Sequence, residues 1–410
     1  MRKLEDLNKS YFGPRVSDGA GVYVAGFVFM WIFNIAMTII AIICNMDMKN
    51  LPNWFTQVAN ALVQVSFVFS VFIYGVVAHK PLLQECKIER KLHWKQAVII
   101  PLIAIVGIMA FLPLATGFVE LIEFITQKKF ETNVTIGDQW WEILISIVVF
   151  CLLPAIGEEI LFRGGVARGL KRKNYLFAII MSGFMFSIFH GSAAQTVHQF
   201  FIGMVFAYLY FVTGSLLASM LAHFANNALA LALGYLPLDD LSKVMPLGAE
   251  IAIWVVVCII GFVAMYFLLR YMMKISKEVK GLPQNQDKMA WAKDLGNAFS
   301  ARGIKDNYSR FNSSLKMLFD DPCDDLNIDG DIVKAISSNE DGVSADGNQN
   351  GMSVTENKSS SATEMDKLLA EANKQTISKR KRFDIMALVV AIGIALVWWI
   401  IMLIQRWNLF

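Results

Sequence analysis

The sequence predicts an all-α protein: a polytopic transmembrane bundle of about eight helices, then a disordered linker and one additional C-terminal transmembrane helix. Two features of the composition favour this fold class, because 56% of the 410 residues are hydrophobic and only 17% are charged. The mean hydropathy of +0.49 is too high for a soluble globule of this size. The third observation is a series of apolar runs long enough to cross a bilayer.

Nine apolar runs approach or exceed the roughly 20 residues that an α-helix needs to cross the hydrocarbon core. The first run follows a charged N-terminal segment and has no small-residue cleavage site, so we expect a retained helix rather than a signal peptide. The fifth and sixth runs are short. The expected spans are 20–44, 57–79, 96–118, 140–164, 175–190, 195–213, 215–235, 248–273 and 383–404.

Composition divides the chain into four parts. Residues 1–139 hold the N-terminal transmembrane helices, and 140–273 hold a helical core with most of the polar residues inside apolar sequence. Residues 274–382 are hydrophilic and rich in Ser, Asn, Asp, Gly and Lys, so we expect a largely disordered cytoplasmic linker before the last transmembrane helix at 383–404. Within this linker, residues 325–336 have the spacing of a calcium loop but lack its closing Glu, and we interpret them as a solvated acidic turn.

The distribution of charge predicts orientation and excludes some partners. Basic residues gather in the N-terminal segment, in the loops 80–95 and 168–173, and at 379–382. Nine crossings put all four groups on one side of the membrane, and the positive-inside rule makes that side cytoplasmic, together with the N-terminus. The net charge of +3 is small and forms no binding face, which argues against nucleic acid as a partner. The five cysteines form no CxxC pair, which argues against a disulfide framework and a zinc knuckle.

Several polar side chains stand inside apolar sequence within about seventy residues. A charge at the centre of a bilayer costs roughly 2.5 to 3.5 kcal/mol on insertion scales, so a chain that keeps several of them indicates a functional site. They lie in the segments PAIGEEILFRGG, FMFSIFHG and LAHFANNALA, and are Glu158, Glu159, Arg163, His190, His223 and Asn227.

The two glutamates differ in their expected partners. Glu159 lies four residues before Arg163, the orientation that favours a helical ion pair, and a purely structural role for this pair stays open. Glu158 points about 100° around the helix from Glu159 and has no basic residue one turn away, so it needs a partner from another helix, or a proton. Two adjacent carboxylates in unlike surroundings differ in acidity, which leaves one of them fit for acid/base chemistry.

The histidines lie in different contexts. His223 and Asn227 share one helix face, where an imidazole and an amide can donate two hydrogen bonds to one oxyanion. His190 closes an apolar run beside Gly191, where a helix-end feature is the simpler alternative, and His198 is interpreted as an interfacial histidine. The sequence holds no GxSxG elbow and no HExxH, so neither a serine nucleophile nor an ordinary zincin is favoured.

Together these motifs resemble the CPBP intramembrane proteases, which include the type II CAAX prenyl endopeptidases, the Abi group of bacteriocin-processing and self-immunity proteins, and lysostaphin-resistance-like proteins. The family pattern is EExxxR, then FxxxH, then HxxxN, and the chain matches all seven positions in this order, with Phe186 before His190. The resemblance covers about residues 140–235. It implies an intramembrane endopeptidase, and the Abi group suggests a bacterial plasma membrane.

The resemblance also implies roles for the residues. Glu158 and His190 would activate water, His223 and Asn227 would stabilise the oxyanion, and Glu159 with its ion pair would support the site. A mechanism without a cofactor is favoured, and zinc held by Glu158, His190 and His223 is the open alternative. The expected substrate is a membrane-associated protein or peptide with a CAAX-like or leader sequence. The linker and last helix would suit a membrane-protein partner.

Two further functions stay open. The first is a catalytically silent scaffold of the same fold that regulates another membrane enzyme, although such a protein has no need to keep all the motifs. The second is a transporter or channel that uses the polar groups as a relay. A transporter would predict inverted repeats or helix pairs broken by Gly or Pro, and the sequence shows no convincing internal repeat.

Overall fold

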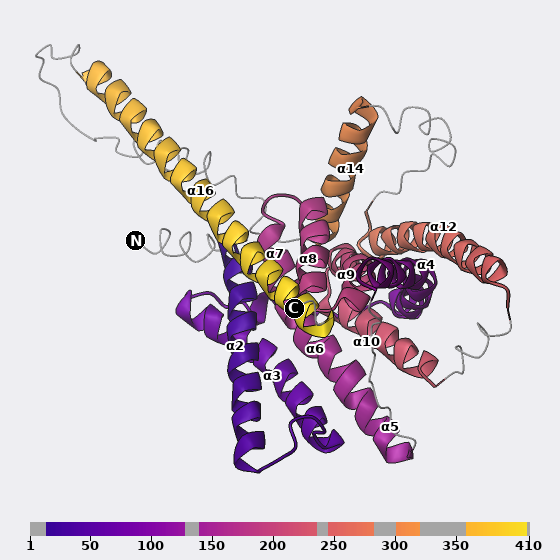
Figure 1. Ribbon diagram of the computed structural model, residues 1–410. Helices are drawn as coiled ribbons and strands as arrows, with labels where there is room; N and C mark the ends of the chain where they lie inside the picture. Colours follow the sequence, from indigo (N-terminus) through magenta and orange to yellow (C-terminus); the bar gives the residue numbers. More distant parts are fainter. Residues whose placement is uncertain (1–13, 128–138, 236–244, 283–300, 320–357, 408–410) are drawn as a thin grey trace, which may run out of the picture.

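The computed structural model describes residues 14–127, 139–235, 245–282, 301–319 and 358–407. Every regular element in these ranges is helical, and eight helices are long and apolar enough to cross a membrane, so the prediction of an all-α, multi-pass bundle is confirmed (Figure 1). The eight are α2 (Val16–Ile43), α3 (Asn53–Val77), α4 (Trp94–Thr126), the composite helix Trp140–Leu170, α9 (Ala193–Thr213), α10 (Leu216–Leu233), α12 (Leu247–Val279) and the apolar part of α16 (Lys358–Trp407).

The composite helix changes its winding twice. It consists of α5 (Trp140–Ser146), η2 (Ile147–Leu152), α6 (Leu153–Glu159), η3 (Ile160–Ala167) and α7 (Arg168–Leu170), and both η segments are π-helical. Such widened turns are rare and occur frequently at functional sites. Pro154 follows the first of them, and proline has no N–H for the carbonyl four residues earlier. The short helix α6, with its two glutamates, therefore lies between two irregular turns.

The fifth expected span, 175–190, is the one that is not among these eight, and it forms the short helix α8 (Tyr175–Phe189), with 15 residues. This is fewer than the roughly 20 residues that cross the hydrocarbon core. The helix ends before Gly191, whose φ of +56° lies in the left-handed region that favours glycine. It packs against α9, the second π-turn and α16, and most of its side chains are buried. It is therefore an interior helix of the bundle.

Part of the segment that we expected to be a disordered linker is helical. Besides the ends of α12 and α16, the structure describes α14 (Ala301–Phe319), which packs on α8 and α9. Its apolar side chains recur at helical spacing, and Leu315, Leu318 and Phe319 are fully buried, so one face gains enough contact to order the helix. The calcium-loop-like residues 325–336 lie outside the described residues. The domain boundaries stay predictions.

The four basic segments meet at one end of the bundle. Arg15 Nη2 lies 3.6 Å from Asp384 Oδ2, which joins the N-terminal segment to the start of the last span. Arg168 Nη2 lies 2.9 Å from Glu85 Oε2, which joins the end of the composite helix to the second basic loop. This clustering agrees with the pattern of nine spans expected from the sequence, in which α8 counts beside the eight longer helices. That this end is cytoplasmic stays a prediction.

The composite helix occupies the centre of the bundle. Figure 1 shows α2 and α3 on one side of it and α4, α9, α10 and α12 on the other. The segment α6 packs directly against α3 and α10, while the second π-turn packs against α2, α3 and α8. Side chains that leave α6 therefore meet helices from both the N-terminal part and the central part of the chain.

Candidate active site

Glu158 extends from α6 toward three other helices. Its Oε1 accepts a hydrogen bond from Gln64 Nε2 of α3 at 3.1 Å. Its Oε2 lies 3.9 Å from His190 Nε2 and 3.8 Å from His223 Nε2, and this buried oxygen accepts no hydrogen bond within the described part of the chain. Of the two alternatives expected for Glu158, a partner from another helix or a proton, the first is present as Gln64. One carboxylate oxygen is anchored, and the other faces two imidazoles.

The contacts on the far side of each imidazole define its tautomer. His190 Nδ1 lies 2.8 Å from the Phe186 carbonyl, which can only accept a hydrogen bond, so Nδ1 carries the proton. His223 Nδ1 lies 2.8 Å from Glu159 Oε1 and carries its proton for the same reason. In the neutral rings, both Nε2 atoms are therefore acceptors. Together with the free oxygen of Glu158, they form a set of acceptors suited to a group that donates hydrogen bonds.

Glu159 and Arg163 form the ion pair expected from their spacing. Arg163 Nη1 donates to Glu159 Oε1 at 2.7 Å, and both side chains are fully buried. Arg163 Nη2 donates to the Gly203 carbonyl of α9 at 2.9 Å, and the guanidinium carbon lies 4.6 Å from the ring centre of Phe186. A Cβ at Gly203 would come within 2.9 Å of Phe186, so glycine permits this close approach. The pair fixes Glu159, which in turn holds His223.

Two aromatic rings hold the imidazoles in place. Phe206 stacks on His223 with ring centres 5.0 Å apart and an interplanar angle of 21°. Phe186 meets His190 edge to face, with ring centres 4.7 Å apart. This explains the phenylalanine four residues before His190, because it supplies both the ring and the carbonyl that orient this histidine. The side chain of His190 remains 19% exposed, which leaves the site accessible.

Asn227 has a structural contact of its own. Its Nδ2 donates to the Phe150 carbonyl at 3.0 Å. In a regular α-helix this carbonyl would bond the backbone N–H four residues later, but that residue is Pro154. Asn226 Nδ2 donates to Asn227 Oδ1 at 3.1 Å, and Asn226 Oδ1 lies 3.2 Å from His198 Nε2. The amide of Asn227 is thereby fixed, with one of its two N–H groups engaged.

The sequence interpretation missed Gln64 and the role of Gly157. Gln64 is a polar residue in the apolar second span, in the segment VANALVQVSFVF, and that signal could have been followed. Gly157 lies beside it, because a Cβ at this position would come within 2.6 Å of the Gln64 backbone oxygen. The close approach of α3 to α6 brings the amide of Gln64 to Glu158.

The donor set suits zinc in chemistry, and its atoms lie slightly farther apart than zinc ligands do. Two neutral imidazoles and one carboxylate are common zinc ligands, with bonds of about 2.0 to 2.2 Å. The two imidazole nitrogens lie 3.8 and 3.9 Å from the carboxylate oxygen, which is wider than two such bonds at a tetrahedral angle allow. In keeping with this, no group of three His, Cys, Asp or Glu side chains with the arrangement of a metal site occurs among the described residues.

The central segment resembles known proteins. Residues 139–229 match the family model of the Rce1-like type II CAAX prenyl endopeptidases. This match confirms the resemblance expected from the motifs, and the matched segment contains all six candidate residues. No match was found among curated proteins or solved structures. We refer to residues 139–229 as the CAAX-protease-like segment.

Proposed function

We propose that the protein is an intramembrane endopeptidase that hydrolyses a peptide bond in a membrane-associated protein or peptide with a CAAX-like or leader sequence. One observation carries the proposal: the buried Oε2 of Glu158 lies free between the Nε2 atoms of His190 and His223. The match of the CAAX-protease-like segment supports the same activity. The eight apolar helices agree with a substrate at the membrane.

The free oxygen of Glu158 and Nε2 of His190 are suited to orient a water molecule. Both are acceptors, so a water between them donates both protons and directs a lone pair toward a substrate carbonyl. As the water oxygen bonds to the carbonyl carbon, Glu158 takes one proton. When the C–N bond breaks, the carboxylic acid returns that proton to the amine that leaves. Gln64 keeps the carboxylate in place through the other oxygen.

His223 and Asn227 are suited to stabilise the tetrahedral oxyanion. His223 would donate to the oxyanion from Nε2 after its ring takes up a proton from solvent, and it would return that proton to solvent when the product leaves. Glu159 Oε1 accepts from Nδ1 and so holds the ring in place. Asn227 uses one N–H for Phe150 and retains the second for the oxyanion. The buried pair of Glu159 and Arg163 acts indirectly, because it fixes the ring of His223.

Zinc is the second candidate for water activation, since both histidines direct Nε2 lone pairs toward Glu158 and have Nδ1–H held by an acceptor. The wide spacing of these atoms favours the mechanism without metal. We therefore expect peptide cleavage to persist in the presence of a strong zinc chelator. Activity that is lost in the chelator and restored by added zinc would contradict this expectation.

The proposed activity can be tested with the full-length protein in lipid nanodiscs. We would incubate it with a prenylated CAAX peptide, the same peptide without its prenyl group, and a leader peptide, and identify products by mass spectrometry. In parallel, the proteins of membranes with and without the chain would be compared. We expect at least one new cleavage product. A folded protein that produces none in either experiment would contradict the proposal and favour a silent scaffold.

A further inference from the structure

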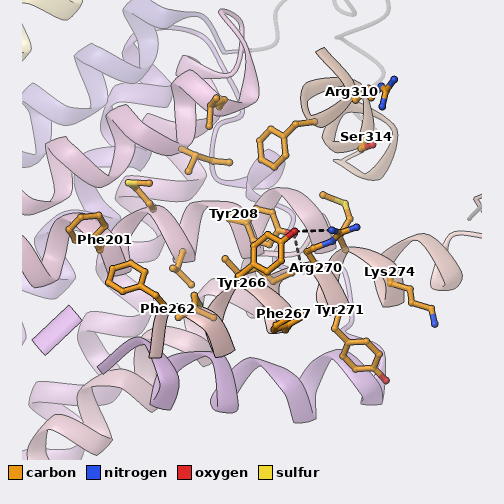
Figure 2. Close-up of a pocket in the computed structure, with 18 of the residues that line it drawn as sticks. Phe201, Tyr208, Phe262, Tyr266, Phe267, Arg270, Tyr271, Lys274, Arg310 and Ser314 are labelled. Carbon is orange, nitrogen blue, oxygen red and sulfur yellow. Dashed lines mark hydrogen bonds between the residues drawn. The ribbon is translucent and has the colours of Figure 1, made fainter. Parts of the chain in front are cut away.

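A large cavity lies apart from the candidate active site, between α9, α12 and α14 (Figure 2). Its volume is about 1530 Å³, and none of the six candidate residues lines it. The helix α9 separates the cavity from the candidate active site. Gly203 and Phe206 of α9 contact the residues of the active site, whereas Val205 and Tyr208 line the cavity. The cavity is therefore a candidate binding site in its own right.

The walls of the cavity change from apolar to basic along its length. In Figure 2, Phe201 and Phe262 lie at one end, and Arg270, Lys274 and Arg310 lie at the other. A fourth basic residue, Lys277, also lines it, and no Asp or Glu does. The cavity thus has the polarity of an amphiphile with an apolar body and an anionic head.

Most contacts of the basic residues in the cavity are with neutral groups, which do not neutralise the positive charge. Arg270 donates to the hydroxyl of Tyr266 at 2.8 Å, and Lys277 donates to the hydroxyl of Ser314 at 3.3 Å. Both partners are neutral. Lys274 lies 3.8 Å from Glu278, but both side chains are largely exposed, so solvent weakens this pair. The basic end therefore keeps an excess of positive charge that would attract an anion.

The position of the cavity agrees with a lipid ligand. Only 11% of the most apolar stretch of α12 is buried, so this helix presents its remaining surface to the bilayer. The basic end of α12 lies beside the start of α4, since Gln96 Nε2 donates to Ser276 Oγ at 2.9 Å. That end belongs to the surface where the basic segments of the chain gather, and basic residues at the end of a membrane helix attract anionic lipid headgroups.

We infer that this cavity binds an anionic glycerophospholipid. Its acyl chains would lie along Phe201 and Phe262, and its phosphate would meet Arg270, Lys277 and Arg310. Pockets for drug-sized ligands have volumes of about 300 to 1,000 Å³, so a cavity of about 1530 Å³ suits a larger ligand with acyl chains. Arginine matches the geometry of phosphate oxygens. A neutral prenyl tail would fill the apolar end but would leave the basic end without a partner.

The test uses native mass spectrometry of the full-length protein, delipidated and then titrated with phosphatidylglycerol or phosphatidylcholine of identical acyl chains. We expect the protein to retain phosphatidylglycerol about tenfold more strongly. The variant Lys277→Gln/Arg310→Gln should lose this preference. Lys173→Gln/Lys305→Gln is the matched control, since it removes the same charge outside the cavity, and it should retain the preference. A second variant, Leu269→Trp, narrows the cavity and should reduce binding of both lipids.

Three results would overturn the inference. Equal retention of the two lipids would show that the anionic headgroup does not contribute to binding. An unchanged preference in Lys277→Gln/Arg310→Gln would show that the lipid binds outside this cavity. Displacement of the phosphatidylglycerol by a neutral prenylated peptide would identify the cavity as a site for the substrate tail. None of these measurements depends on cleavage, so the inference and the proposed protease activity can fail separately.

Discussion

The neighbours Glu158 and Glu159 have the same side chain and different environments. Each has one oxygen without a hydrogen bond in the described part of the chain, but Oε1 of Glu159 contacts Arg163 and His223, whereas Oε1 of Glu158 contacts the neutral amide of Gln64. Sequence spacing predicted this division, because only Glu159 has a basic residue one turn away. Spacing could not predict Gln64, since that contact depends on how closely α3 packs against α6. Local periodicity therefore predicts partners within a helix better than partners between helices.

Asn227 combines a structural contact with a proposed catalytic one. We expect Asn227→Ala to lower kcat by about 10² to 10³, the usual effect of losing one oxyanion donor, with little change in KM. Loss of the Phe150 contact should also reduce stability by about 1 to 3 kcal/mol. Asn226→Ala is the comparison variant, because it removes the contact to Asn227 Oδ1 but leaves both N–H groups of Asn227, and it should lower kcat less. A destabilised Asn227→Ala protein with unchanged kcat would show that the residue serves only to satisfy the carbonyl.

The central helix depends on its irregular turns and on close contact with its neighbours. Pro154 and Gly157 can be read from the sequence, but the contacts that they make possible appear only in the packed bundle. Asn227 donates to the carbonyl of Phe150, four residues before Pro154, and Gly157 lets the backbone of α3 approach α6. These contacts join residues far apart in sequence. The elements that hold the site were therefore predictable, whereas the contacts that align it were not.

We expect Gly157→Ala to impair cleavage. The added Cβ would come within 2.6 Å of the Gln64 backbone oxygen, so α3 must move and the hydrogen bond from Gln64 to Glu158 is weakened. Unfolding temperature and cleavage rate should both fall. Gly117→Ala is the control, because a Cβ at Gly117 meets no atom within 4 Å. Equal rates in the two variants would show that the approach of α3 does not position Glu158.

The helices outside the CAAX-protease-like segment contribute to the same bundle. Trp398 Nε1 of α16 donates to the Phe189 carbonyl at 3.3 Å, and Trp399 Nε1 donates to Thr196 Oγ1 at 2.9 Å. The last helix therefore packs against the turn that carries His190. Hydropathy predicted this helix but not its place, and composition predicted disorder where α14 forms. The helix α14 forms because helices distant in sequence bury one of its faces, and local composition cannot predict such contacts.

The topology leads to a labelling prediction. Cys44 is exposed at the end of α2, opposite the basic end, so an impermeant maleimide should label it from outside intact cells. Cys86 is buried, and burial raises the pKa of its thiol to about 12, so it should stay unlabelled. The test variant keeps these two cysteines and replaces the others. A second variant carries Lys173→Cys and lacks Cys44. Its cysteine at position 173 lies at the basic end, so the maleimide should label it only in permeabilised cells. Labelling of Cys44 only after permeabilisation would reverse the orientation.

The central claim is that Glu158 removes a proton from the attacking water. The most direct test is the rate of peptide cleavage by Glu158→Gln, measured by mass spectrometry beside the wild-type protein and Glu120→Gln, the same change at an exposed position of α4. We predict that Glu158→Gln lowers the rate by at least about 10²-fold, since a general base contributes about 10² to 10⁴, whereas Glu120→Gln retains full activity. Undiminished cleavage by a folded Glu158→Gln protein would contradict the proposed mechanism.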